Sequence, residues 1–217
     1  MSYLTTEMAR EAIQQMKSFH VKARDLYRNF DMDLLDNLGR RNIIMSQTQE
    51  KFFAQALSKK YKGVREDGRT GEPDIVIEEL DKELECKLTS RHKSGSISFQ
   101  SDFETLQKKG SLDYLYVIAD QEFKKFSVLL FEGLTTDDFR PLSTGARGKV
   151  AMFKHKGMKK CRQLLGDCVS LNDINILKCN EKLSNLKITP SQKRKAEKSL
   201  KYWQETPTKY RFSLEAI

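Results

Sequence analysis

The sequence predicts an α/β fold around one core, with an N-terminal helical extension and a basic C-terminal part. Residues 75–77 are β-branched and residues 83–88 alternate strictly, as the two strands of a β-hairpin do, and residues 114–119 and 126–131 are apolar runs typical of buried strands. Residues 5–38 carry apolar side chains at three- and four-residue steps, which is typical of a helix. A chain of 217 residues can bury one sizeable core, so we expect one α/β layer with a helical addition.

The N-terminal segment is predicted to form a helical arm over residues 1–45. Met8, Ala12, Met16 and Phe19 fall on one helical face, and Gly39 is placed as the C-cap. Such an arm is a candidate subunit interface of a homodimer. The alternative is that this stripe packs against the chain's own core, as methionine-bearing stripes more often do.

A second helix is expected to begin near Ser46, where Ser46 and Gln49 form a capping box, and it opens the domain over residues 46–217. The residues just before it form a basic link. Arginine and asparagine can read guanine and adenine edges, and an apolar tip can wedge into a base step. The candidate DNA contacts of this link are Arg40, Arg41, Asn42 and Met45. The alternative is a loop whose apolar residues turn into the core.

The predicted hairpin brings acidic and basic side chains together. The β-branched run 75–77 follows Asp74, and a strand is expected there. Successive side chains of a strand point to opposite faces, so Glu85 and Lys87 share the polar face and Cys86 joins the apolar one. Antiparallel pairing would let Asp74 approach them from the neighbouring strand.

Two carboxylates beside an ammonium group suit phosphodiester hydrolysis with Mg²⁺. This cation requires octahedral oxygen coordination, and a protein often supplies only one or two carboxylates. Asp74 and Glu85 are the expected metal ligands. Lys87 is expected to orient or deprotonate the attacking water, or to bind the scissile phosphate. The competing interpretation is an exposed hairpin with ordinary surface charges.

The pair Pro73-Asp74, followed by Glu85-Cys86-Lys87, resembles the motif of the PD-(D/E)xK phosphodiesterase superfamily. That superfamily includes type II restriction endonucleases, Holliday-junction resolvases and repair nucleases. The resemblance implies a restriction-endonuclease-like core, with a mixed β-sheet flanked by helices. It also implies Mg²⁺ as the cofactor and products that carry 5′-phosphates.

Many members of this superfamily carry a further acidic residue on the helix that precedes the motif. Glu50 occupies that place here, which makes it a candidate fourth catalytic residue. A solvated helix carboxylate is an equally good interpretation of Glu50. Glu66, Asp67 and Glu72 are rival acids in the loop before the first motif strand.

Basic and amide side chains beyond the hairpin are further candidate DNA contacts, although a solvated surface is the alternative for each. They are Arg91, Lys93, Gln100, Arg147, Lys149, Lys154 and Lys156. A strand over 97–100 and a helix from Ser101 to Gly110 are expected between them. Segment 143–149 lacks the Gly-Lys-Ser/Thr ending of a P-loop, so no nucleotide cofactor is expected. A last helix is predicted after Thr189, with lysines around its surface.

The net charge of +9 and the pI near 9.3 favour a polyanionic partner. No apolar run approaches the ~20 residues of a membrane span, and no signal-peptide stretch is recognised at the N-terminus. The four cysteines are not spaced as zinc ligands, and free thiols in a reducing compartment are expected. We therefore expect a cytoplasmic protein with no membrane partner.

Together these observations predict a Mg²⁺-dependent, sequence-specific, double-stranded DNA endonuclease of the type II restriction kind, acting as a homodimer. Two alternatives stay open. One is a structure-specific nuclease, such as a Holliday-junction resolvase or repair nuclease on the same fold. The other is a DNA-binding protein without catalytic activity.

Overall fold

The computed structural model describes residues 2–67, 69, 71–90, 97–143 and 148–217. The chain divides into two compact units, one of Met1–Gly166 with Leu214–Ile217 and one of Asp167–Ser213. The division falls after Gly166, whereas the sequence predicted a boundary between residues 45 and 46. The predicted boundary lies inside a continuous helix, which explains the difference.

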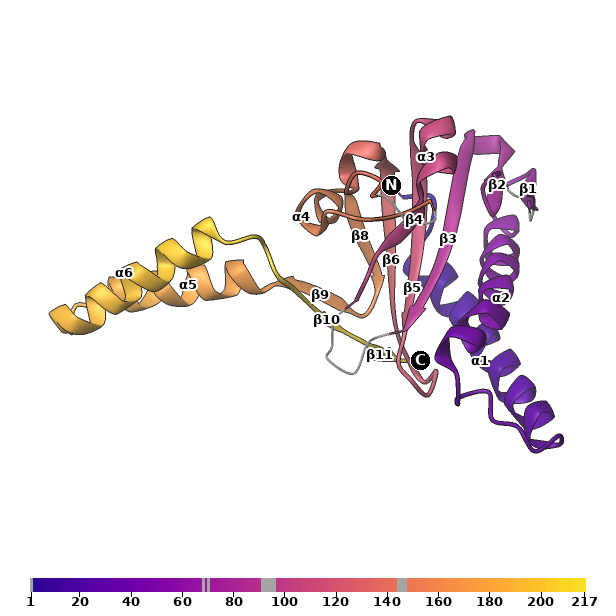
Figure 1. Cartoon of the computed structure of the whole chain (residues 1–217), viewed down its shortest axis with the longest axis horizontal. Helices are drawn as coiled ribbons and strands as arrows, with labels where there is room; N and C mark the ends of the chain where they lie inside the picture. The colour runs from indigo at the N-terminus through magenta and orange to yellow at the C-terminus, as the bar shows by residue number, and fades with distance from the viewer. Residues whose placement is uncertain (1, 68, 70, 91–96, 144–147) are drawn as a thin grey trace. The chain divides into compact units, whose positions relative to one another are not determined.

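The first unit is built on a mixed β-sheet flanked by helices (Figure 1). Its described strands follow the order β1-β2-β3-β5-β6-β11, and β8 also pairs with β6. Strands β3 and β5 run parallel, whereas the other neighbours in this sheet are antiparallel. The bounds are β1 Val64–Glu66, β2 Ile75–Ile77, β3 Lys82–Ser90, β5 Leu112–Ala119, β6 Lys125–Leu134, β8 Cys161–Leu165 and β11 Glu215–Ala216. The coarse prediction of a mixed sheet with flanking helices is confirmed.

Two long helices pack together and onto this sheet, α1 Thr6–Arg28 and α2 Leu38–Ser58. Ile13 and Met16 of α1 are fully buried, as is Phe53 of α2, and all three belong to the same core as the apolar face of the sheet. The N-terminal segment is therefore part of the main core rather than a separate arm. Burial of this apolar area is the main stabilising term for both helices.

The boundaries predicted for these helices are wrong. Helix α1 ends at Arg28, and α2 begins at Leu38 with the Asn37 side chain accepting a hydrogen bond from the Arg40 backbone N–H. Gly39 therefore lies in the first turn of α2 and is not a C-cap. The Ser46 hydroxyl donates to the Ile43 carbonyl oxygen at 2.9 Å, so Ser46 lies inside the helix and does not begin it.

Smaller elements complete the first unit. A two-stranded sheet pairs β4 Gln100–Asp102 with β7 Lys149–Ala151, and β4 begins three residues later than the predicted strand. Helix α3 Phe103–Lys109 follows at once, and its N-cap is Asp102 rather than Ser101. The short helical turns are η1 Glu78–Leu80, η2 Thr136–Asp138, α4 Lys154–Gly157 and η3 Met158–Lys160.

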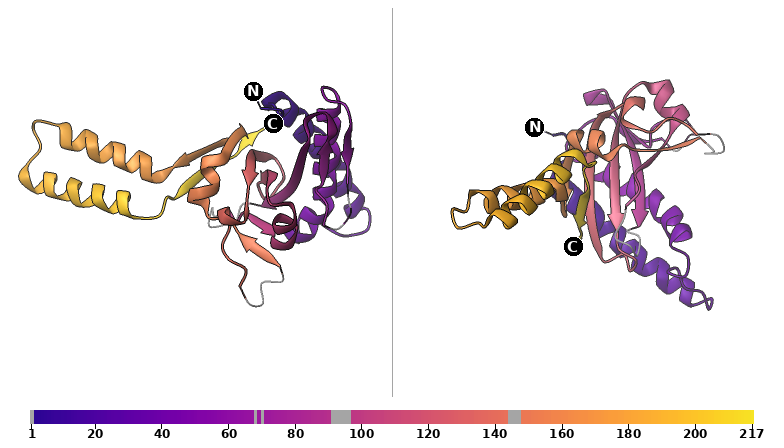
Figure 2. Two further views of the ribbon diagram at one scale, coloured as in Figure 1. Left: turned by 90° about the horizontal axis from the view of Figure 1, so that it is seen from above. Right: turned by 60° about the vertical axis from the view of Figure 1, so that its left-hand side comes forward.

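The second unit pairs β9 Asp167–Ser170 with β10 Tyr210–Ser213, and holds helices α5 Leu171–Ser184 and α6 Pro190–Glu205 between them. The two helices form an antiparallel hairpin (Figure 2). Thr189 and Gln192 make the predicted capping box at the start of α6, with Pro190 in the first turn.

Two further expectations concern the described residues. None of the helices in this part of the chain is long and apolar enough to cross a membrane. The four cysteines are all free thiols, and Cys86 is buried on the apolar side of its strand.

Candidate active site

The predicted hairpin places Asp74 beside the second motif strand. Strands β2 and β3 pair antiparallel, with Ile75 opposite Leu84, so Asp74 lies next to the start of the Glu85–Lys87 segment. A carboxylate oxygen of Asp74, Oδ2, accepts a hydrogen bond from the Cys86 backbone N–H at 2.6 Å. This bond ties the loop before β2 to the middle of β3 and fixes the carboxyl group near the polar face of the strand.

Glu85 and Lys87 lie on that polar face, as the alternation predicted. The Lys87 ammonium group forms an ion pair with Oε1 of Glu85. Glu85 is only 7% exposed, and its second oxygen, Oε2, is buried with no hydrogen-bond partner among the described residues. A buried carboxylate oxygen without a donor is costly, so this atom is suited to receive a cation or a water molecule.

The side chain of Glu50, on helix α2, lies close enough to Asp74, Glu85 and Lys87 to interact with their charges. The neighbouring residue Gln49 fixes this part of the helix, because its Nε2 donates to the Leu115 carbonyl oxygen of β5 at 2.9 Å. Burial raises the pKa of Glu50 to about 7, and the charge of Asp74 adds to the shift while that of Lys87 opposes it. The sequence predicted Gln49 only as the capping partner of Ser46, and that prediction is wrong, since the Gln49 side chain bonds to β5 instead. This bond depends on how α2 packs on the sheet, which a local pattern does not show.

The pKa values of Asp74 and Lys87 show how closely these charges interact. Burial and the negative charge of Glu85 together raise the pKa of Asp74 to about 6, against the lowering effects of Lys87 and the Cys86 N–H. Burial lowers the pKa of Lys87, but Glu85 and Asp74 raise it by more, so the pKa of Lys87 lies above its ordinary value. Lys87 is therefore a cation at neutral pH, and the carboxyl groups hold a surplus of negative charge.

The carboxylates and the lysine face open space. Asp74 and Glu85 line a cavity of about 590 Å³, and Lys87 lines a second cavity of about 230 Å³. Asp102 lines both, although no feature of the sequence pointed to it. Its Oδ1 accepts from the Thr105 N–H, so the N-cap of α3 also sets the border between the two cavities.

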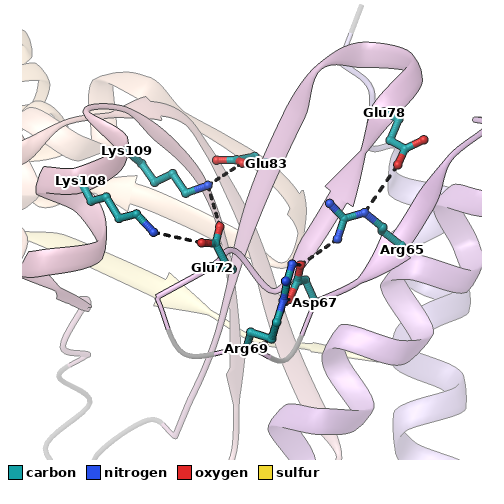
Figure 3. Close-up of polar contacts among 8 residues, drawn as sticks. All are labelled: Arg65, Asp67, Arg69, Glu72, Glu78, Glu83, Lys108 and Lys109. Atoms are coloured by element: carbon teal, nitrogen blue, oxygen red, sulfur yellow. Dashed lines mark hydrogen bonds and ion pairs between the residues drawn. The ribbon is translucent and has the colours of Figure 1, made fainter.

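The rival acids Asp67 and Glu72 are engaged in ion pairs (Figure 3). Arg69 and Arg65 both bind the Asp67 carboxylate, and they hold its pKa well below the ordinary value. Glu72 lies between Lys108 and Lys109, each at 3.0 Å. Asp67 and Glu72 thus pair with other cations, whereas Glu85 pairs with Lys87 and Asp74 interacts with Lys87 through its charge.

Lys109 of this network reaches Glu83 as well, at 2.7 Å, and Arg65 reaches Glu78 at 3.5 Å (Figure 3). The ion pairs therefore join α3 and the loop before β2 to the start of β3. Arg69, Glu72 and Lys108 also line the larger cavity. Glu66, the third rival acid, is exposed on β1.

Two of the DNA contacts predicted before the motif lie in the interior. Arg41 is 0% exposed, and its guanidinium group donates to the carbonyl oxygens of Asp120 and Gln121 and to the Ser90 hydroxyl. Met45 is also 0% exposed and packs in the main core. The expectation that these two side chains touch DNA is wrong, because the link is the first part of α2 and this face of the helix is buried.

The other residues of that link differ in their surroundings. Arg40 is exposed in the first turn of α2. Asn42 is half-buried, and its side chain bonds to the Ser90 hydroxyl and the Arg41 guanidinium group. Asn42 therefore supports the end of β3, and Arg40 is the member of the set that solvent reaches most freely.

The remaining candidate DNA contacts come from β4, β7 and α4. Gln100 and Lys149 line the smaller cavity beside Lys87. The Lys154 ammonium lies 5.8 Å from the centroid of the Phe99 ring, and Lys156 donates to the Asp137 carbonyl oxygen at 2.8 Å. Three candidates, Arg91, Lys93 and Arg147, lie outside the described residues.

The side chains of Asp74 and Glu85 fit Mg²⁺ as a site with two carboxylate ligands. Within the described residues, no group of three or more His, Cys, Asp or Glu side chains is arranged to hold a metal ion. Asp74 and Glu85 offer two carboxylates, one of them with an unpartnered buried oxygen. Mg²⁺ is commonly held by one or two carboxylates plus water and substrate phosphate, so a two-carboxylate site is compatible with it.

Comparison with protein-family models, with curated proteins and with solved structures finds no match for this chain.

Proposed function

We propose that this protein is a Mg²⁺-dependent DNA endonuclease, of the sequence-specific type II restriction kind, that hydrolyses phosphodiester bonds in double-stranded DNA to leave 5′-phosphates. The observation that supports this best is the meeting of Asp74 and Glu85 from adjacent strands at one cavity, with Lys87 ion-paired to Glu85. Two acids and one ammonium group at an open face match the needs of phosphodiester hydrolysis.

Asp74 and Glu85 would hold the metal, Glu85 through its unpartnered Oε2. When bound, Mg²⁺ lowers the pKa of a water ligand and neutralises charge that develops on the phosphate oxygens. The raised pKa of Asp74 supports a cation site here, because a cation would relieve the repulsion between the two carboxylates.

The protein's own side chains then supply position and proton transfer. Lys87 stays charged and is held by Glu85, so it can bind a non-bridging phosphate oxygen or orient the attacking water. Glu50 has a pKa of about 7, which suits a group that accepts a proton from water near neutral pH.

The positive charge of the chain favours DNA as the substrate. Gln100 and Lys149 line the cavity next to Lys87, where they would meet the strand that is cut. Cutting both strands of a two-fold symmetric duplex site requires two active sites, and a homodimer supplies them.

Plasmid cleavage tests this function directly. With Mg²⁺, the wild-type protein should cut linear plasmid into discrete fragments, whereas Asp74→Ala and Lys87→Ala should lower the rate by at least about 10³-fold and still bind DNA. Glu122→Gln removes an exposed carboxylate away from the site and serves as the control. Undiminished cleavage by either alanine variant would show that the chemistry lies elsewhere.

The same experiment separates the related functions. Cleavage of branched DNA without cleavage of plain duplex would indicate a structure-specific nuclease. Tight, salt-dependent binding with no cleavage in Mg²⁺ or Mn²⁺ would indicate a DNA-binding protein without activity.

A further inference from the structure

The unit Asp167–Ser213 is unusually rich in positive charge. It holds ten of the chain's Lys and Arg residues against five Asp and Glu residues. More than half of the net charge of +9 therefore lies in less than a quarter of the chain. A surplus of this size in a small helical hairpin favours a polyanionic ligand.

These cations are also poorly neutralised. Within residues 167–213, all of which the structure describes, the one ion pair joins Lys201 to Glu205 at 3.8 Å on an exposed helix face. Cations around the candidate active site behave differently, since Arg65, Arg69, Lys108 and Lys109 each bind an acid. The lysines of the hairpin thus remain available to an external anion.

The end of the hairpin encloses a hollow of about 620 Å³ between the last turn of α5 and the first half of α6. Its lining includes the side chains of Lys182, Lys187 and Lys195. All three are exposed, and each comes from a different part of the hairpin, namely α5, the connecting loop and α6. Three ammonium groups therefore border one concave surface.

Two amide side chains of the same hollow are oriented as hydrogen-bond donors. The Asn185 Oδ1 accepts from the Lys187 backbone N–H at 2.9 Å, and the Gln192 Oε1 accepts from the Thr189 N–H at 3.0 Å. With their oxygens engaged by the loop, Asn185 and Gln192 present NH₂ groups as their remaining polar atoms. The side chains of Cys179, Ile188 and Ala196 also line the hollow, so the ammonium and amide donors are its polar contacts for an anion.

We propose that this hollow binds the phosphate backbone of nucleic acid and that Lys182, Lys187 and Lys195 are its main contacts. This assignment rests on the proposed function, since it names a second place where the DNA substrate is held. An anionic membrane surface is disfavoured, because interfacial helices present a continuous apolar face. Here the exposed apolar residues of the helices and their loop are Leu177, Leu186 and Tyr202, which are scattered over three elements.

The test compares two triple variants of the full-length protein that lose the same charge from the same hairpin. Lys182→Gln/Lys187→Gln/Lys195→Gln removes the ammonium groups of the hollow. Lys178→Gln/Lys193→Gln/Lys198→Gln removes exposed lysines outside it. Circular dichroism and thermal unfolding verify that both variants are folded.

Fluorescence anisotropy with a labelled duplex of about 30 base pairs in EDTA, between about 50 and 200 mM KCl, measures binding without cleavage. We expect the first variant to bind at least about tenfold more weakly, with the log–log salt slope reduced by about 0.9 for each phosphate that the protein no longer neutralises. The second variant should change the affinity by less than about threefold. Equal decreases in affinity for both variants, or no decrease for the first, would overturn the proposal.

Two further measurements separate this proposal from that of the nuclease. If the Lys182→Gln/Lys187→Gln/Lys195→Gln variant binds DNA normally and the wild type cuts DNA, the phosphate site is refuted and the nuclease is not. If only this variant loses DNA binding and the wild type never cuts DNA, the nuclease is refuted and the phosphate site is not. Vesicles of phosphatidylserine serve as the competing ligand, and hollow-dependent binding to vesicles but not to duplex would also overturn the assignment.

Discussion

At the scale of single residues, the carboxyl group of Asp74 illustrates how burial and a like charge act together. Its folded-state pKa of about 6 lies above the ordinary value of 3.8, so folding disfavours the ionised form. The contribution of Asp74 to stability is therefore fully present below about pH 4 and is lost as the pH rises through about 6. A site with this property binds a cation at the expense of a proton.

We predict that Asp74→Asn stabilises the metal-free protein by about 1–3 kcal/mol at pH 8 and has little effect on stability at pH 4. The substitution removes the negative charge that burial penalises, and its amide oxygen can still accept the hydrogen bond from the Cys86 N–H. Mg²⁺ should raise the melting temperature of the wild type at pH 8 but not that of the variant. Scanning calorimetry in EDTA and in Mg²⁺ checks both parts. An Asp74→Asn variant that is less stable than the wild type at pH 8 would contradict the predicted stabilisation.

Glu50 leads to a prediction about the pH dependence of cleavage. Its pKa of about 7 implies that the ionised fraction, and with it the rate, rises between about pH 6 and 8. Glu50→Gln should lower the rate by about 10²-fold and remove this limb of the pH profile. Single-turnover cleavage from about pH 5.5 to 9 measures it, and an unchanged profile in the variant would exclude Glu50 from proton transfer.

The sequence located the candidate site better than its surroundings. Alternation in a strand places Glu85 and Lys87 on one face whatever the rest of the fold does, so this part of the prediction depended only on local geometry. The positions of Gln49 and Asp102 depend on how α2 and α3 lie against the sheet. No local pattern contains that information.

At the scale of elements, helix α2 shows why local capping signals can mislead. Asn37 and Ser46 are both acceptable N-caps, and Ser46 also has a glutamine three residues later. The helix begins at the earlier signal because doing so buries Arg41 and Met45 against the rest of the molecule. Tertiary packing therefore decided between two local patterns of similar strength.

Arg41 then fastens α2 to the turn between β5 and β6. Its guanidinium group bonds to the carbonyl oxygens of Asp120 and Gln121 and lies 5.1 Å from the Phe123 ring centroid. We predict that Arg41→Ala lowers the free energy of unfolding by about 2–4 kcal/mol, since it removes a fully buried side chain and takes a donor from the Gln121 carbonyl oxygen and from the Ser90 hydroxyl.

The neighbouring exposed residue provides the control for that experiment. Arg40→Ala should change stability by less than about 0.5 kcal/mol, because Arg40 is exposed and makes no side-chain bond among the described residues. Urea unfolding at equilibrium measures both variants. Similar decreases in the two would contradict the structural role given to Arg41.

At the scale of the whole molecule, composition predicted the charge but not its division between two units. Any basic chain of this length supports a polyanion hypothesis, whereas the boundary after Gly166 follows from which strands pair. Strand β11 returns residues 215–216 to the main sheet, so the second unit is an insertion within the first. That topology depends on a pairing between distant residues, Glu215 and Phe126, which sequence periodicity does not reveal.

The proposed homodimer can be tested through helix α1. Phe19 and Leu26 are 40% and 57% exposed, and they lie seven residues apart on one face of the helix. Exposed apolar residues that share a face are suited to burial against a second copy. We predict that the wild type sediments at about twice the 25.2 kDa of one chain and that Leu26→Glu sediments as a monomer.

Val21 supplies a matched control for this change. It is 58% exposed on the same helix, but it lies about 140° around the axis from Leu26, so Val21→Glu adds the same charge to a different face. Sedimentation velocity at about 1–50 µM compares the three proteins. The monomeric variant should nick supercoiled plasmid where the dimer linearises it, because one active site reaches one strand at a time. A wild type that is monomeric at about 50 µM and still cuts both strands together would refute the dimer.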